Sequence, residues 1–260
     1  MDLGISGRVA FVAASSQGLG FACARSLARE GVSVWLNGRD EAKLARTAEQ
    51  LRREVPDARV SYVAADLVAA EGRQRILDEV PDADILVTNN AGPRPGAYQD
   101  WDEDALVSAL RANAVPAVEL MRAYLPGMRA QRFGRIVNIT SAMVKSPAPD
   151  MGLSTSARAA LTAISKSIGK VAMRDNVTIN NLLPERVDSP RQQYMAERLM
   201  SSAGISLDEA RDRIASTVTA GRLGRPEEFG DACAYLCSAQ AGYIGGQNLQ
   251  LDGGSYEGLI

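Results

Sequence analysis

Two pairs of polar residues, each with a spacing of four, could move protons in this chain of 260 residues. One pair is Ser141 and Lys145, and the other is Ser154 and Arg158. The sequence contains no histidine, so a proton must be carried by tyrosine, lysine, serine, a carboxylate or water. A desolvated lysine near an arginine can have a lowered pKa and act as an acid or a base. Arginine stays protonated and binds hydroxyls or anions.

Each of these residues can also be explained without a catalytic role. Ser154 could be the N-cap of a helix, and Lys145 could be a solvated loop residue. Tyr98 and Tyr194 offer phenols and Asp150 offers a carboxylate, but packing, substrate contact or a surface loop also explains them.

The elements that position these residues follow from the hydrophobic pattern. Short apolar runs alternate with amphipathic stretches, which predicts parallel strands joined by helices. Right-handed crossovers then give a doubly wound α/β sheet of seven parallel strands with helices on both faces, and its ligand lies outside the carboxyl ends of the strands. The expected strands are 8–15, 33–37, 60–65, 85–89, 135–140, 177–183 and 247–252. The expected helices are 18–31, 40–54, 102–129 and 155–173.

Composition limits the classes of protein. The chain is 46% apolar and 23% charged, which fits a single domain over 1–260, and the more polar stretch 188–219 is expected to be a helical flap over the active site. A net charge of −2 without charged blocks argues against a nucleic-acid partner. No apolar run approaches the roughly 20 residues of a membrane span. The N-terminus has no basic stretch followed by an apolar one, so we expect no signal peptide and a cytoplasmic protein.

The three cysteines have no metal-binding spacing. Cys233 and Cys237 lie four apart on an expected helix, and we interpret them as small core residues. We therefore expect no metal site.

A glycine-rich turn, Ala13 to Gly20, separates the first strand from the first helix. Such a turn lets backbone N–H groups approach a pyrophosphate at the helix N-terminus. After the second strand, Gly38 stands where a carboxylate would bind the ribose of NAD, and Arg39 offers a guanidinium to the 2′-phosphate of NADP. NADP(H) is therefore favoured over NAD(H), with a solvated surface arginine as the alternative reading.

Together these motifs resemble the short-chain dehydrogenase/reductase family over nearly the whole chain. The resemblance implies a single Rossmann domain. The matching segments are Val12–Gly20, Asp66–Leu67, Asn89–Gly92, Gly221–Glu228 and Gly245–Gly254. The cofactor contacts that it implies are Ala14, Ser15, Ser16, Gln17, Gly18, Leu19, Arg39, Asp66, Leu67, Asn90, Ala91, Gly92, Arg158, Pro184 and Val187.

Two departures concern the cofactor. Ala14 replaces the first glycine of the loop, and its Cβ is expected to exclude positive φ and to weaken or displace the cofactor. Glu185 stands where the family has glycine, so its carboxylate could repel a phosphate or bind the substrate.

The sequence departs further from the family at the catalytic positions. By resemblance, Asn113 and Ser141 match the family's catalytic asparagine and serine, but Ser154 and Arg158 fall on its tyrosine and lysine. We expect Arg158 to keep the anchoring role and to lose proton exchange. Lys145 could supply the missing proton. A Ser-x-x-x-Lys followed by a Ser-x-x-x-Arg resembles an atypical, 3-oxoacyl-ACP-reductase-like branch.

The sequence thus predicts an NADP-dependent oxidoreductase for a ketone or secondary alcohol, with Ser141, Asn113 and Lys145 as its catalytic set. A re-purposed fold for a dehydration, isomerisation or cyclisation stays open, as does a dinucleotide-binding protein without turnover. By resemblance, the partners are a small-molecule substrate and further copies of the chain, in a homotetramer or homodimer.

Overall fold

Residues 1–259, the part of the chain that the computed structural model describes, are built on one sheet of seven strands. All pairings are parallel, and the spatial order is β3-β2-β1-β4-β5-β6-β7. The order reverses between β1 and β4, and the carboxyl ends of these strands flank the crevice where such sheets bind ligands. The strands are β1 (Val9–Val12), β2 (Ser33–Gly38), β3 (Val60–Ala64), β4 (Ile85–Thr88), β5 (Gly134–Ile139), β6 (Val177–Pro184) and β7 (Asn248–Leu251). The predicted doubly wound α/β fold is confirmed.

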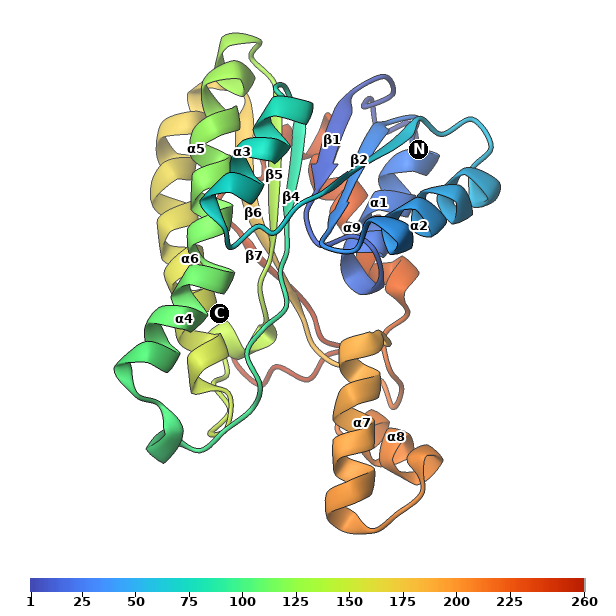
Figure 1. The fold of residues 1–260 in the computed structure, drawn as a ribbon, viewed down its shortest axis with the longest axis vertical. Coiled ribbons are helices and arrows are strands. Elements are labelled where there is room, and N and C mark those ends of the chain that lie inside the picture. The colour runs from blue at the N-terminus through green and yellow to red at the C-terminus, as the bar shows by residue number, and fades with distance from the viewer. Residues whose placement is uncertain (260) are drawn as a thin grey trace.

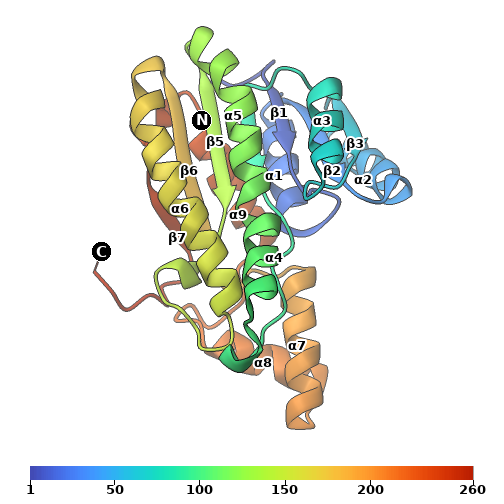
Figure 2. The same ribbon diagram turned by 60° about the vertical axis from the view of Figure 1, so that its left-hand side comes forward.

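Helices cover both faces of this sheet (Figures 1 and 2). One face packs against α1 (Gly18–Arg29), α2 (Glu41–Glu54) and α9 (Pro226–Cys237). The other packs against α3 (Ala70–Glu79), α4 (Glu103–Asn113), α5 (Val115–Ala130) and α6 (Gly152–Ala172). Short 3₁₀ segments are η1 (Tyr98–Asp100), η2 (Ala142–Val144), η3 (Met173–Asp175) and η4 (Gln240–Tyr243).

The cysteines belong to the core between α1 and α9. Cys23, Cys233 and Cys237 are fully buried. Their interpretation as core residues is confirmed for Cys233 and Cys237.

The expected helix 102–129 is wrong as a single helix, because the chain breaks at Ala114 into α4 and α5. Pro116 has no N–H group to donate to the carbonyl of Ala112, four residues earlier. The side chain of Asn90 donates to that carbonyl instead, over 2.7 Å. The loop after β4 is thereby attached to the break, next to Asn113. Two smaller differences are that the first strand ends at Val12 and that α3 has no counterpart among the predicted helices.

The segment 188–219 contains α7 (Pro190–Ala203) and α8 (Leu207–Ser216), which project from one end of the sheet (Figures 1 and 2). These two helices share a small apolar cluster formed by Ala196, Ala210 and Ile214. The chain enters and leaves this pair side by side, because Asp188 N–H donates to the carbonyl of Gly224 over 2.8 Å. We call this connection the neck.

None of the helices within residues 1–259 combines the length and the apolar character that a membrane crossing requires.

Candidate functional site

One cavity of about 780 Å³ lies at the carboxyl ends of the central strands, between the sheet and α7. Most of the predicted site residues line it. These are Ala14, Ser16, Gln17, Gly18, Leu19, Arg39, Asp66, Leu67, Asn90, Ala91, Gly92, Ser141, Ser154, Arg158, Pro184 and Val187. Sequence segments far apart in the chain therefore meet in one space, as the fold predicts.

Asn37 holds the glycine-rich loop at the end of β1. Its side-chain carbonyl accepts from Ala14 N–H at 3.2 Å, and its amide donates to the carbonyls of Val63 and Ala65. Ser15 does not line the cavity, because it is buried and its hydroxyl donates to the carbonyl of Val12 at 2.7 Å. Ser15 therefore supports the loop from behind.

The expectation that Ala14 excludes positive φ is wrong. Ala14 adopts φ of +45°, the left-handed region that glycine enters at no steric cost. The hydrogen bond from Asn37 holds the loop in this shape in spite of the methyl group. The loop therefore keeps the conformation of a glycine loop and carries backbone strain.

The adenine end of the cavity fits a phosphorylated dinucleotide. The N-cap of α1, Gln17, makes no side-chain capping bond, so the first-turn N–H groups of this helix have no side-chain acceptor. Gly18 next to it has φ of +62°. Arg39 is exposed on the cavity lining, and Asp66 forms a turn by accepting from Val68 N–H at 2.9 Å. Free N–H groups at a helix start suit a pyrophosphate, and Arg39 suits a 2′-phosphate.

At the other end, Ser154 and Arg158 lie on one face of α6 and form a pair. The Arg158 Nε–H group donates to the Ser154 hydroxyl oxygen at 3.3 Å, and Nη1 donates to the carbonyl of Ile139 at 3.0 Å. A Cβ atom on Gly92 would lie 3.1 Å from Arg158 Nη2 and 3.4 Å from Ser154 Oγ. The absence of that carbon leaves room for a ligand against both side chains.

The N-cap reading of Ser154 is wrong. The helix begins at Gly152 with Met151 as its N-cap, and Ser154 is a buried residue of the first turn. Because Thr155 N–H already donates to the carbonyl of Met151, the helix starts three residues earlier than predicted. The Ser154 hydroxyl is therefore free for the cavity and for Arg158.

Arg158 is a partly buried cation. Burial, with a further contribution from the positive charge of Arg191, lowers the pKa of the Arg158 guanidinium to about 10. No carboxylate within residues 1–259 lies close enough to Arg158 to form an ion pair.

Ser141 follows β5 and faces the same space. Its hydroxyl oxygen accepts from Met143 N–H at 3.2 Å, at the start of η2. The register of β5 and β6 brings Ser141 beside the end of β6, where Glu185 also lines the cavity. Burial raises the pKa of the Glu185 carboxyl, and Arg186, 3.4 Å away, partly offsets this effect.

Asn113 and Lys145 do not line the cavity. Asn113 is buried at the end of α4, its amide donates to the carbonyl of Ala109 at 3.3 Å, and its Oδ1 atom has no partner in the described part of the chain. The ammonium of Lys145 lies 5.2 Å from the ring centre of Tyr256, near the C-terminus. Lys145 therefore lies beside this ring and outside the set of lining residues, and its role as a proton source stays a prediction.

Sequence reasoning missed several polar lining residues, among them Arg94, Arg191 and Gln192. Gln192 is 6% exposed, and its Nε2 atom has no acceptor within residues 1–259. The signal was present in Ser189-Pro190, a common helix start, which orients the next two residues. Ser189 accepts from Gln192 N–H and Pro190 begins α7.

Comparison with known proteins agrees with this geometry. The profile of the enoyl-(acyl carrier protein) reductase family, a short-chain dehydrogenase type, matches residues 13–256. The chain therefore belongs to the short-chain dehydrogenase/reductase family.

Individual relatives match nearly the full length of this chain. The NADPH-dependent reductase BacG of Bacillus subtilis is 30% identical, covering 98% of this chain and 100% of that protein. The uncharacterized oxidoreductase YvaG of the same organism is 31% identical, covering 98% of each. The L-sorbose reductase of Gluconobacter frateurii, solved with NADPH and L-sorbose, superimposes with a TM-score of 0.94 at 29% identity, covering all of both chains.

Proposed function

We propose that this protein is an NADPH-dependent oxidoreductase that interconverts a ketone and a secondary alcohol, in the manner of the 3-oxoacyl reductases. One observation carries the proposal. A single cavity joins the glycine-rich loop and Arg39 at one end to Ser141, Ser154 and Arg158 at the other. The similarity to an NADPH-dependent reductase and to a sugar reductase supports the same reaction class.

The residues present fit NADPH. The start of α1 would hold the pyrophosphate, Arg39 the 2′-phosphate, and Arg158 the ribose next to the nicotinamide. Bound NADPH supplies a hydride, which the protein itself cannot provide.

The protein has to supply a proton to the carbonyl oxygen. We assign this proton to the Ser154 hydroxyl, which then takes a proton from the Arg158 Nε–H group that it already accepts from. The neutral guanidine regains its proton from solvent. A serine alone is too weak an acid for this task, but a guanidinium whose pKa is lowered to about 10 can return a proton to it. This assignment departs from our expectation from the sequence that Arg158 loses proton exchange. The Ser141 hydroxyl donates a hydrogen bond to the same carbonyl oxygen and polarises it.

Lys145 stays a second candidate for the proton source. Lys145 is not among the lining residues and its ammonium lies near the Tyr256 ring, whereas Ser154 lines the cavity. The Ser154–Arg158 pair therefore ranks first.

The test is oxidation of NADPH by the purified protein with a panel of ketones, sugars and 3-oxoacyl thioesters, followed by nicotinamide absorbance. Turnover with any carbonyl compound supports the proposal. Tight NADPH binding without turnover across the panel would favour a dinucleotide-binding protein. Product formed without a change in nicotinamide absorbance would favour a dehydration, isomerisation or cyclisation.

Assembly as a homotetramer or homodimer is part of the proposal. Exposed apolar side chains occur on the outer helices, with Val171 57% and Ile164 38% exposed on α6, and Val115 40% exposed on α5. Light scattering on the purified protein tests it, and a monomer at micromolar concentration would contradict it.

A further inference from the structure

Positive charge gathers at the substrate end of the cavity without a negative partner. The guanidinium groups of Arg94, Arg158 and Arg191 all belong to this lining. Within residues 1–259, none of the three forms an ion pair with a carboxylate. Glu185 is the nearest acidic residue of the lining along the chain to α7, and it is paired with Arg186 at 3.4 Å. Arg158 is partly buried, whereas the side chains of Arg94 and Arg191 are exposed. Three like charges on one cavity lining attract an anion.

Arg191 is positioned to meet such an anion. It follows Pro190 in the first turn of α7, and its Nη2 atom donates to the carbonyl of Pro93 in the loop after β4 at 3.2 Å. Its guanidinium also lies 5.5 Å from the ring centre of Tyr194. These contacts fix the group across the mouth of the cavity while most of its N–H donors stay free, since guanidinium has five.

The neighbouring residue supplies a second donor. Gln192 is 6% exposed and lines the cavity, and its Nε2 atom has no acceptor in the described chain. A buried amide without a partner is expensive, so this N–H₂ group indicates a ligand atom that accepts hydrogen bonds. One guanidinium and one neutral amide match the single charge and the two oxygens of a carboxylate.

We propose that Arg191 and Gln192 bind a carboxylate of the substrate, so that the protein acts on oxo acids rather than on neutral ketones. The proposal rests on the reductase function proposed above and adds the substrate class. Arg158 and Ser154, deeper in the cavity, then receive the carbonyl group of the same molecule.

The test compares a 2-oxo acid with its neutral ester, for which 4-phenyl-2-oxobutanoate and its ethyl ester are suitable probes. The wild type is expected to have the lower KM for the acid. Arg191→Ala should raise KM for the acid by about 10- to 100-fold and leave KM for the ester within about twofold. Gln192→Glu should impair the acid further, because its carboxylate repels that of the substrate, and should spare the ester.

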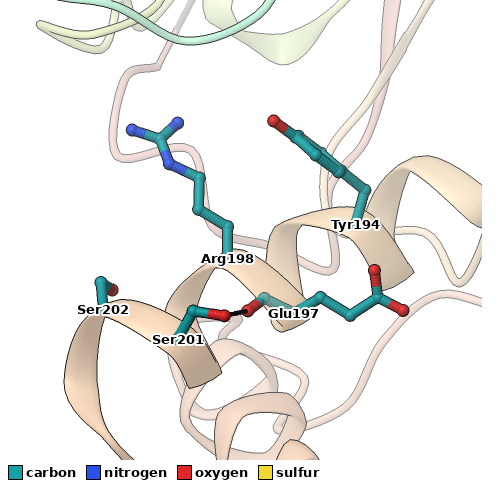
Figure 3. Close-up of a pocket in the computed structure, with 5 residues that line it drawn as sticks. All are labelled: Tyr194, Glu197, Arg198, Ser201 and Ser202. Atoms are coloured by element: carbon teal, nitrogen blue, oxygen red, sulfur yellow. Dashed lines mark hydrogen bonds between the residues drawn. The ribbon is translucent and has the colours of Figure 1, made fainter.

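Arg198→Ala is the matched control. Arg198 lies two turns further along α7 and lines a neighbouring surface pocket together with Tyr194 (Figure 3). Its Nη1 atom is 4.0 Å from Oδ2 of Asp150. This variant loses the same charge from the same helix, so the acid-to-ester ratio should stay that of the wild type. An equal effect of Arg198→Ala would mean that only the overall charge of the flap matters and would overturn the proposal.

A binding measurement separates this proposal from the reductase function. Calorimetry with the NADP⁺-loaded protein and the oxo acid should show binding that Arg191→Ala abolishes, without any turnover. Reduction of acid and ester with equal KM would overturn the carboxylate site and leave the reductase standing. Arg191-dependent binding of the oxo acid without reduction of any carbonyl compound would overturn the reductase function and leave the carboxylate site standing. If Arg191→Ala weakens NADPH itself and leaves the acid-to-ester ratio unchanged, Arg191 serves the cofactor and the proposal fails.

Discussion

Arg158 donates its Nε–H group to the Ser154 hydroxyl oxygen over 3.3 Å, one turn apart on α6. A spacing of four places two side chains on the same face of a helix, so both residues face the cavity that they line. The two residues therefore form a hydrogen-bonded donor pair on the cavity lining.

Removal of the Ser154 hydroxyl should remove most of the reductase activity. We expect Ser154→Ala to lower kcat by about 10²- to 10⁴-fold, because the carbonyl oxygen loses its proton donor, with little change in the Kd of NADPH. Ser156→Ala on the same helix is the control, since Ser156 is exposed and donates to the carbonyl of Leu153. Steady-state kinetics and NADPH fluorescence provide the two readouts, and a Ser154→Ala enzyme with normal kcat would refute the assignment.

The rate of reduction should depend on pH through Arg158. Burial lowers the pKa of this guanidinium to about 10, and only its protonated form can return a proton to Ser154. The kcat for reduction should be level below that pH and fall as the pH rises through about 10. An ordinary arginine would give no such break until far higher pH. A profile without a break near this value in the stable range would contradict the role of Arg158 as an acid.

Lys145 provides the counter-test. If the proton comes from Ser154, Lys145→Ala should keep at least about half of the wild-type kcat, because its ammonium lies over the Tyr256 ring and not on the cavity lining. Measurement of kcat at neutral pH decides the matter. Loss of most of the activity in this variant, with normal NADPH binding, would show that Lys145 and not Ser154 supplies the proton.

Replacing the strained loop residue Ala14 by glycine should stabilise the protein. Ala14→Gly removes the methyl group from a residue with φ of +45°, so we expect the free energy of unfolding to rise by about 1 kcal/mol. The Kd of NADPH should fall at the same time, because the loop has more room for the pyrophosphate. Ala13→Gly is the control; Ala13 is buried without positive φ and should lose stability. Thermal unfolding checks both, and a destabilised Ala14→Gly would show that the methyl group packs favourably.

Preference for NADPH should reside in Arg39. Arg39→Ala should weaken NADPH binding by about 10-fold or more and leave NADH binding nearly unchanged, because only NADPH has the 2′-phosphate that we expect the guanidinium to contact. Arg46→Ala, an exposed arginine on α2 outside the cavity, controls for net charge. Equal weakening of both cofactors by Arg39→Ala would assign Arg39 to another part of the nucleotide.

The sheet was predictable because apolar runs and glycine turns are local signals. Pro116 indicates a break between α4 and α5. The hydrogen bond that compensates for this break could not be predicted, because its donor, Asn90, is 22 residues from the carbonyl of Ala112. The same limit applies to the site. Ser154 and Arg158 were recognisable by position, whereas Gln192 acquires meaning only where tertiary packing buries its amide without an acceptor. The φ of Ala14 was mispredicted because Asn37, from the next strand, imposes it.

The neck at Asp188 and Gly224 has a kinetic consequence. Beyond it, α7 and α8 carry their own apolar cluster, so they can swing as one body while few contacts to the sheet are broken, among them those of Arg191 to Pro93 and of Arg198 to Asp150. A Cβ atom on Gly18 would lie 3.4 Å from Cδ of Pro190, so α7 begins close to the glycine-rich loop, and we expect spent nucleotide to leave after that swing. We then expect an ordered reaction in which the nucleotide binds first and leaves last. The maximal rates of the fastest substrates should be equal, because opening of this helix pair and not their chemistry would limit them.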